Sequence, residues 1–121
     1  MISPEMFRRF CIPHIDDMAS VLEYPMYHLD GINAIPHLDH LLDLDALRVI
    51  QWVPGAGHER IDQWYDLIER IIERGKSVQV FAETAEIEPL VERIGTRGLL
   101  ITVSDPSHKN AEFLLHRYGL D

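Results

Sequence analysis

Hydrophobic positions follow two spacings that take turns along the chain. An apolar residue at every third or fourth position is typical of a helix, and a short run of valine, isoleucine and leucine is typical of a buried strand. Glycine or proline stands at many of the joints. The pattern predicts the order α-β-α-β-α-β-α-β-α within one α/β domain, residues 1–121.

Four strands are predicted, at residues 25–29, 48–53, 78–82 and 99–103. Gln79 is the single polar residue of the third. Strands as apolar as these belong to parallel sheets that are buried on both faces, and the helices are numerous enough to cover both sides. We therefore expect a parallel four-stranded sheet.

About five helices are predicted between the strands: residues 3–22, 34–42 and 59–74, a short helix near Pro89 that ends at Gly95, and residues 107–118. Ser3 supplies a capping hydroxyl for the first helix, and Pro13 is expected to kink or interrupt it. Asn33 is a candidate cap for the second. The third has the clearest apolar face, followed by Gly75 as its stop.

Composition and charge exclude several classes of function. The chain has 121 residues, 46% hydrophobic and 26% charged, which is ordinary for one folded domain and well short of the roughly 250 residues of a complete eight-stranded α/β barrel. Its net charge of −9 disfavours nucleic acid and anionic membranes as partners. One cysteine, Cys11, and no long apolar stretch or secretion signal indicate a cytoplasmic protein.

Polar side chains follow each predicted strand, where ligands gather in parallel α/β folds. His28 and Asp30 stand two apart at the first strand end, so both can point the same way. That arrangement suits a shared metal ion or a carboxylate that orients an imidazole for proton transfer. The alternative is structural, with Asp30 capping the next helix and His28 bonded to backbone.

Gly55 and Gly57 follow the second strand and precede a helix, which makes them candidates for cofactor binding because glycine lets backbone amides approach an anion. The P-loop lysine and the third dinucleotide-binding glycine are missing. A tight strand-to-helix turn is the alternative interpretation.

Glu83 and Asp105 follow the third and fourth strands and are expected to converge with His28 and Asp30. This predicts His28, Asp30 and Glu83 as catalytic residues, and His28, Asp30 and Asp105 as ligands of a divalent metal ion. The alternative for residues 105–107 is a turn that leads into a capped helix.

Three stretches together resemble the C-terminal half of the uroporphyrinogen decarboxylase superfamily, which includes cobalamin-dependent methyltransferases. They are residues 3–7 with Pro13 in the same helix, the strand end at residues 27–31, and residues 51–55. The resemblance covers nearly all of the chain. It implies half of a (β/α)8 TIM-type barrel, because members of the superfamily are complete barrels; a flavodoxin-like open sheet is the alternative.

The methyltransferase branch of this superfamily implies a zinc site made by a His-x-Cys-Gly strand end and a later cysteine. This chain keeps His28 and Gly31 but has Asp30 in place of the first cysteine, and Ser104 or Asp105 stands nearest the second. A thiolate-rich zinc site is therefore not available, and a harder, oxygen-rich site remains. The decarboxylase branch uses groups of the other barrel half, so this chain alone is not expected to be a decarboxylase.

The resemblance implies a methyl-transfer component that works with a corrinoid through a partner protein, or a non-catalytic remnant of one. The alternative function is a non-enzymatic module for small-ligand binding or assembly. A half-barrel exposes two sheet edges and apolar inner side chains, which two copies would cover by pairing. We therefore expect a homo-oligomer, most simply a homodimer.

Overall fold

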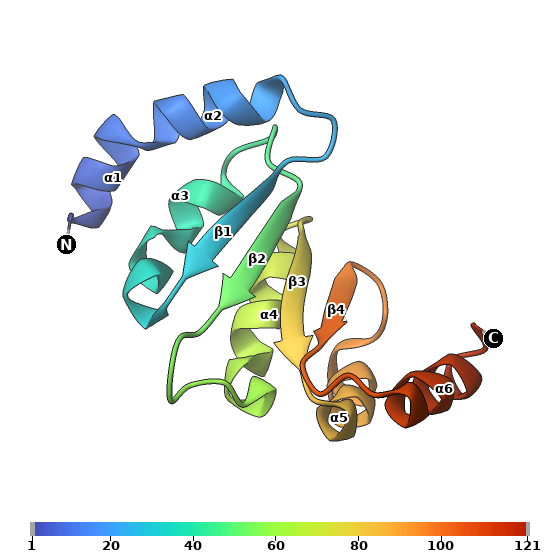
Figure 1. The fold of residues 1–121 in the computed structure, drawn as a ribbon. Coiled ribbons are helices and arrows are strands. Elements are labelled where there is room, and N and C mark those ends of the chain that lie inside the picture. The colour runs from blue at the N-terminus through green and yellow to red at the C-terminus, as the bar shows by residue number, and fades with distance from the viewer. Residues whose placement is uncertain (1, 121) are drawn as a thin grey trace.

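The computed structural model describes residues 2–120, which form a four-stranded all-parallel sheet with six α-helices and two 3-10 helices (Figure 1). The strands are β1 (Met26–Asp30), β2 (Val49–Val53), β3 (Ser77–Ala82) and β4 (Leu99–Val103). The helices are α1 (Pro4–Phe10), α2 (Ile12–Ser20), η1 (Ile32–His37), α3 (Leu38–Leu42), η2 (Ile61–Trp64), α4 (Tyr65–Glu73), α5 (Thr84–Ile94) and α6 (His108–Arg117). None of them is long and apolar enough to cross a membrane.

The strands lie in the order β1-β2-β3-β4, so each is hydrogen-bonded to its neighbour in sequence. The predicted parallel sheet is confirmed. The flavodoxin-like alternative is wrong, because that sheet places its first strand between the second and the third. With no reversal of strand order, right-handed crossovers return every connecting helix to the same side of the sheet.

Only one face of the sheet is covered by helices. In Figure 1, α3, α4 and α5 lie behind the strands, and nothing lies in front of them. The covered face carries the fully buried side chains of Ile50, Trp52, Val78 and Val80. The apolar strands indicated burial of both faces, but in this chain helices cover one face, because continuous apolar strands do not reveal on which side the crossovers return.

The first predicted helix is two helices, α1 and α2, with Cys11 between them and Pro13 in the first turn of α2. The interruption at Pro13 is confirmed. The Ser3 cap is confirmed as well, since its hydroxyl accepts a hydrogen bond from the Met6 amide at 3.2 Å. The second helical segment begins at Gly31, whose φ of 81° favours glycine, so Asn33 is not its cap.

Helix α5 is longer than predicted and holds Pro89 in its interior. Glu83 and Glu86 form a reciprocal capping box, in which each side chain accepts a hydrogen bond from the other residue's backbone amide. This box starts the helix at Thr84, and Pro89, exposed to solvent, costs it one internal hydrogen bond.

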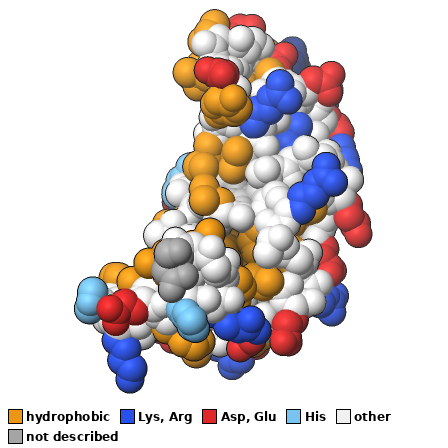
Figure 2. Space-filling model, turned by 90° about the vertical axis from the view of Figure 1, so that its right-hand side faces the viewer, with side chains coloured by type: hydrophobic (Ala, Val, Ile, Leu, Met, Phe, Trp, Pro, Cys, Tyr) orange, Lys and Arg blue, Asp and Glu red, His pale blue; other side chains and the backbone are white. Residues whose placement is uncertain are grey.

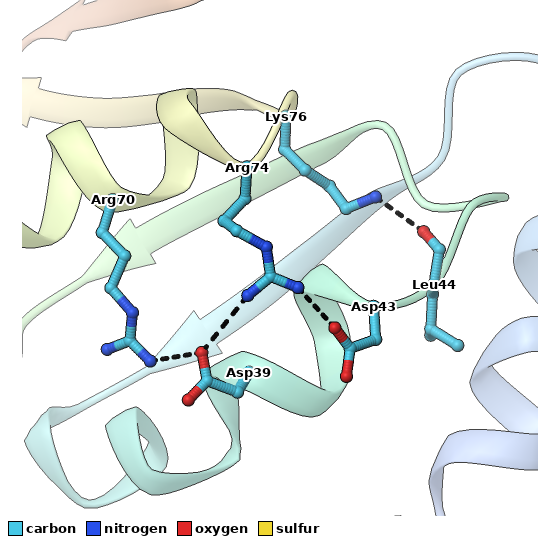
Figure 3. A network of polar contacts seen from close by, with 6 residues as sticks. All are labelled: Asp39, Asp43, Leu44, Arg70, Arg74 and Lys76. Carbon is cyan, nitrogen blue, oxygen red and sulfur yellow. Dashed lines mark hydrogen bonds and ion pairs between the residues drawn. The ribbon is translucent and has the colours of Figure 1, made fainter.

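Charged side chains join α3 to α4 on the outer surface (Figure 3). Arg70 pairs with Asp39, and Arg74 pairs with Asp43. Beside them, the buried Lys76 donates a hydrogen bond from Nζ to the Leu44 carbonyl at 2.6 Å, and its burial lowers the pKa of its amine. These contacts hold the helical layer together and face away from the uncovered side of the sheet.

Candidate functional site on the uncovered sheet face

The uncovered face carries a row of polar side chains across its middle. Register pairs His28 with Gln51, and Gln51 with Gln79, so that neighbouring positions on β1, β2 and β3 present an imidazole and two amides. On β4, the position that register pairs with Gln79 is occupied by the apolar Leu100.

His28 is held by Gln51. Its Nδ1 lies 2.5 Å from the Gln51 Oε1, and an amide oxygen only accepts hydrogen bonds. The proton of the neutral ring is therefore on Nδ1, and Nε2 is left with its lone pair. Because the His28 side chain is exposed, Nε2 is free to take a proton from a molecule bound on this face.

Gln79 is buried although it lies on the uncovered face, with 4% of its surface exposed. Its Nε2 donates to the Thr102 hydroxyl at 2.8 Å and to the Val80 carbonyl at 3.2 Å. Its Oε1 is buried and has no hydrogen-bond partner among the described residues. An amide oxygen left in this state costs about 1–3 kcal/mol, so the row is polar at the expense of stability.

A second row lies nearer the carboxyl ends of the strands, the end called the mouth here. It pairs Asp30 with Val53, and Phe81 with Thr102. Asp30 is exposed, and within residues 2–120 no hydrogen bond or ion pair joins it to His28. The two residues share a face and the mouth, as their spacing predicts, without forming a bonded pair.

A hollow of about 690 Å³ opens at the mouth beside β2 and β3. Its walls include three carboxylates and one guanidinium, and the ring of Phe81 is among the apolar groups that complete them. The charged lining residues are Glu59, Glu83, Glu86 and Arg60. The balance of charge disfavours phosphate and favours neutral or cationic molecules.

Gly55 and Gly57 form the turn beside this hollow, and the amide of Gly57 already holds an anion. It donates to the Glu59 carboxylate at 2.8 Å, and this hydrogen bond lowers the pKa of Glu59. The geometry matches the alternative of a tight strand-to-helix turn, in which a carboxylate of the chain itself occupies the place of a bound phosphate.

Glu83 and Asp105 both serve the backbone around α5. Glu83 caps the helix. Asp105 Oδ1 accepts from the Thr84 amide at 2.7 Å and from its hydroxyl at 2.9 Å, and Oδ2 accepts from the Asn110 amide group at 3.1 Å. The Thr84 amide is the main reason that the pKa of Asp105 is lowered. Asp105 therefore ties the loop before α6 to the start of α5, as in the alternative of a structural turn.

The structure does not gather a metal site. Among residues 2–120, no group of three or more histidine, cysteine, aspartate and glutamate side chains is placed to hold a metal ion, so the predicted set of His28, Asp30 and Asp105 is not brought together. The zinc implied by the methyltransferase branch does not fit these residues either, because no thiolate lies at the mouth and Asp105 is engaged by Thr84.

The fold and this site together define a parallel α/β protein with a polar row and a basic imidazole nitrogen on a sheet face that helices leave bare. Comparison with known protein families, with curated proteins and with solved structures found no match. Sequence reasoning missed Gln79 and Thr102 as members of the site. The feature of the sequence that could have identified Gln79 is its place as a polar residue inside an apolar strand. In the structure, register aligns this residue with Gln51 and His28.

Proposed function

We propose that this chain is one half of a (β/α)8-type barrel, and that its uncovered sheet face binds a small polar molecule, with His28 as the proton acceptor. The observation that carries the proposal is the row of His28, Gln51 and Gln79 on that face. Neighbouring strands in sequential order with helices on one side are the arrangement expected of such a half.

The side chains of the site restrict the chemical class of molecule that can bind there. The amides of Gln51 and Gln79 recognise hydrogen-bonding groups, and the acidic hollow at the mouth disfavours phosphorylated molecules. His28 contributes Nε2 as a base because Gln51 holds its other ring nitrogen in the protonated form. A neutral or cationic molecule with N–H or O–H groups fits these features best.

The enzymatic form of this proposal is a methyl-transfer component, for which the resemblance to cobalamin-dependent methyltransferases is the support. A corrinoid held by a partner protein would supply the methyl group. His28 Nε2 would take the proton of a thiol acceptor as the acceptor's sulfur receives the methyl group, and the electron pair of the broken cobalt–carbon bond would stay on the corrinoid. The non-enzymatic form is ligand binding alone, which the polar row supports without any catalytic step.

Two measurements test these forms. The first mixes the protein with methylcobalamin and a thiol and follows demethylation by absorbance. A rate above the protein-free reaction that His28→Ala abolishes, while the exposed histidine variant His14→Ala does not, supports methyl transfer. A rate equal to that of the protein-free reaction removes the enzymatic form.

The second measurement follows the side-chain amide signals of Gln51 and Gln79 by NMR during titration with acetamide, ethanolamine or inorganic phosphate. Binding on the uncovered face is expected to shift these signals with acetamide or ethanolamine, and the shifts should disappear in His28→Ala. If none of the probes moves either signal, or only phosphate does, the proposed site is wrong.

A further inference from the structure

Both edges of the sheet are free among the described residues. β1 pairs only with β2, and β4 pairs only with β3. Each edge strand has five residues and presents unpaired backbone N–H and C=O groups. Exposed edges of this kind are templates for pairing with another chain, and proteins normally cover or interrupt them.

The chain also exposes more surface than a monomer of its size should. A folded monomer of 14.0 kDa is expected to expose about 6,700 Å². The chain exposes 7739 Å², a surplus of about 1,000 Å² over that expectation. A stable protein–protein interface buries about 800 Å² on each partner, so the surplus matches the surface that one interface would remove.

Much of the exposed apolar surface lies at the two edges and on the uncovered face. On that face, Met26 and Leu100 are 44% and 55% exposed on the edge strands themselves. A second, apolar hollow of about 390 Å³ lies beside β4, between α5 and α6. Figure 2 views the molecule from the side of β4 and α6 and shows several groups of exposed hydrophobic side chains, with polar and charged surface between them.

The opposite edge carries an apolar projection. Helices α1 and α2, called the arm here, flank β1 and expose Met6, Phe10 and Met18. The arm packs on the covered side of the sheet, where Phe7 stacks on His37. The hollow beside β4 is on the same side, lined by residues such as Ile101, Leu114 and Tyr118. The edge at β4 therefore has an apolar hollow, and the edge at β1 has an apolar projection that could fill a hollow of this kind.

Resting on the proposed half-barrel, we propose that two copies of this chain close an eight-stranded barrel, in which β4 of each copy pairs in parallel with β1 of the other. A two-fold axis along the barrel makes both junctions at once and leaves no free edge. The arm of each copy lies on the hollow beside β4 of its partner. The two uncovered faces become the barrel interior, so Met26, Phe81 and Leu100 are buried and the polar row is enclosed.

Charges at the amino ends of the edge strands support this pairing. Glu23 precedes β1 and Arg97 precedes β4; both are exposed, and neither makes an ion pair within residues 2–120. Parallel pairing of β1 with β4 of a second copy brings a glutamate of one chain to the arginine of the other. Opposite charges at each junction favour this register over the alternatives.

Sedimentation velocity at micromolar concentration tests the proposal. Wild type should sediment with twice the chain mass of 14.0 kDa, and Leu100→Asp, which puts a charge in the barrel interior, should sediment as a monomer. Ala85→Asp adds the same charge at an exposed position of α5 and should remain dimeric. A wild-type monomer, or a mixture of open-ended oligomers, would overturn the closed dimer.

Charge reversal at the strand ends tests the dimer without depending on whether Leu100→Asp folds. Arg97→Glu should weaken the dimer at least several-fold, and Glu23→Arg in the same chain should restore it. Amide hydrogen exchange then locates the contact, since amides of β1 and β4 should gain protection as concentration rises while those of β2 should not. A dimer whose edge strands gain no protection contradicts the pairing, whatever the result of ligand titration at His28.

Discussion

At the scale of residues, the polar groups of the uncovered face differ in how well they are satisfied. His28 and Gln51 share a hydrogen bond, and in the loop after β4 Asp105 accepts hydrogen bonds from Thr84 and Asn110. Gln79 is the exception, because its buried Oε1 has no partner among the described residues. A protein keeps such a group at a cost to stability, and functional sites are where that cost is usually found.

Gln79→Leu should therefore raise the free energy of unfolding by about 1 kcal/mol, because removing the unsatisfied oxygen outweighs the loss of the hydrogen bond to Thr102. Urea denaturation measures the change. Thr102→Val is the matched variant: it removes only the acceptor and should lower the free energy of unfolding by about 1 kcal/mol. Equal destabilisation by both variants would contradict this interpretation of Gln79.

The lowered pKa of Asp105 predicts that the stability of the folded chain depends on pH. Its pKa is lowered in the folded state, chiefly by the Thr84 amide, so the stability that it contributes is present above the pKa of the unfolded chain. That contribution is lost as the pH falls below about 4 and through the lower folded value. In thermal unfolding, Asp105→Asn should lose stability relative to wild type at neutral pH, and the difference should shrink at acidic pH. A difference that is constant with pH would count against the hydrogen-bonded carboxylate.

At the scale of elements, the start of α5 shows how a helix overrides an unfavourable residue. The Glu83 and Glu86 capping box and the buried Ile87 and Leu90 secure the first turns, so the helix continues through Pro89. The third and fourth strands are thereby connected by a helix of 11 residues, long enough to cross back over the sheet.

Glu83→Ala should lower the free energy of unfolding by about 1 kcal/mol, because the cap of α5 is lost. Glu83→Ser supplies a hydroxyl cap and should retain most of the stability. Urea denaturation compares the two. If Ser is as destabilising as Ala, the role of Glu83 is not capping, and its prediction as a catalytic residue gains weight.

At the scale of the whole molecule, an uncovered sheet face and two free edges make stability depend on association. If two copies close a barrel, the folded state is favoured by mass action, and the thermal midpoint rises with protein concentration. Leu100→Asp should remove that dependence while leaving the midpoint of dilute protein nearly unchanged, because Leu100 is 55% exposed in one chain. Calorimetry over a range of concentrations measures both. A wild-type midpoint independent of concentration would contradict a folding unit of two chains.

Much of the local structure could be predicted from the sequence. Branched apolar runs located all four strands, and three-to-four spacing located helices. The caps by Ser3 and Ser107 and the break near Pro13 follow from local chemistry. The sequence pattern underestimates the extent of α5, because a glutamate is a less familiar cap than serine and because a proline such as Pro89 normally marks the start of a helix. This error concerns the end of an element, where weak local preferences compete.

The site was predictable only in part, because register is a property of the sheet. The sequence by itself determined that His28 and Asp30 end a strand and that Gln79 interrupts an apolar one. Tertiary structure decided that Gln51 and Gln79 stand beside His28, since strand order and register set the partners. It also decided which face is bare, because every crossover returns to one side when strands follow in sequence. Strand patterns are local, whereas the side on which a helix packs depends on contacts between residues far apart in the chain.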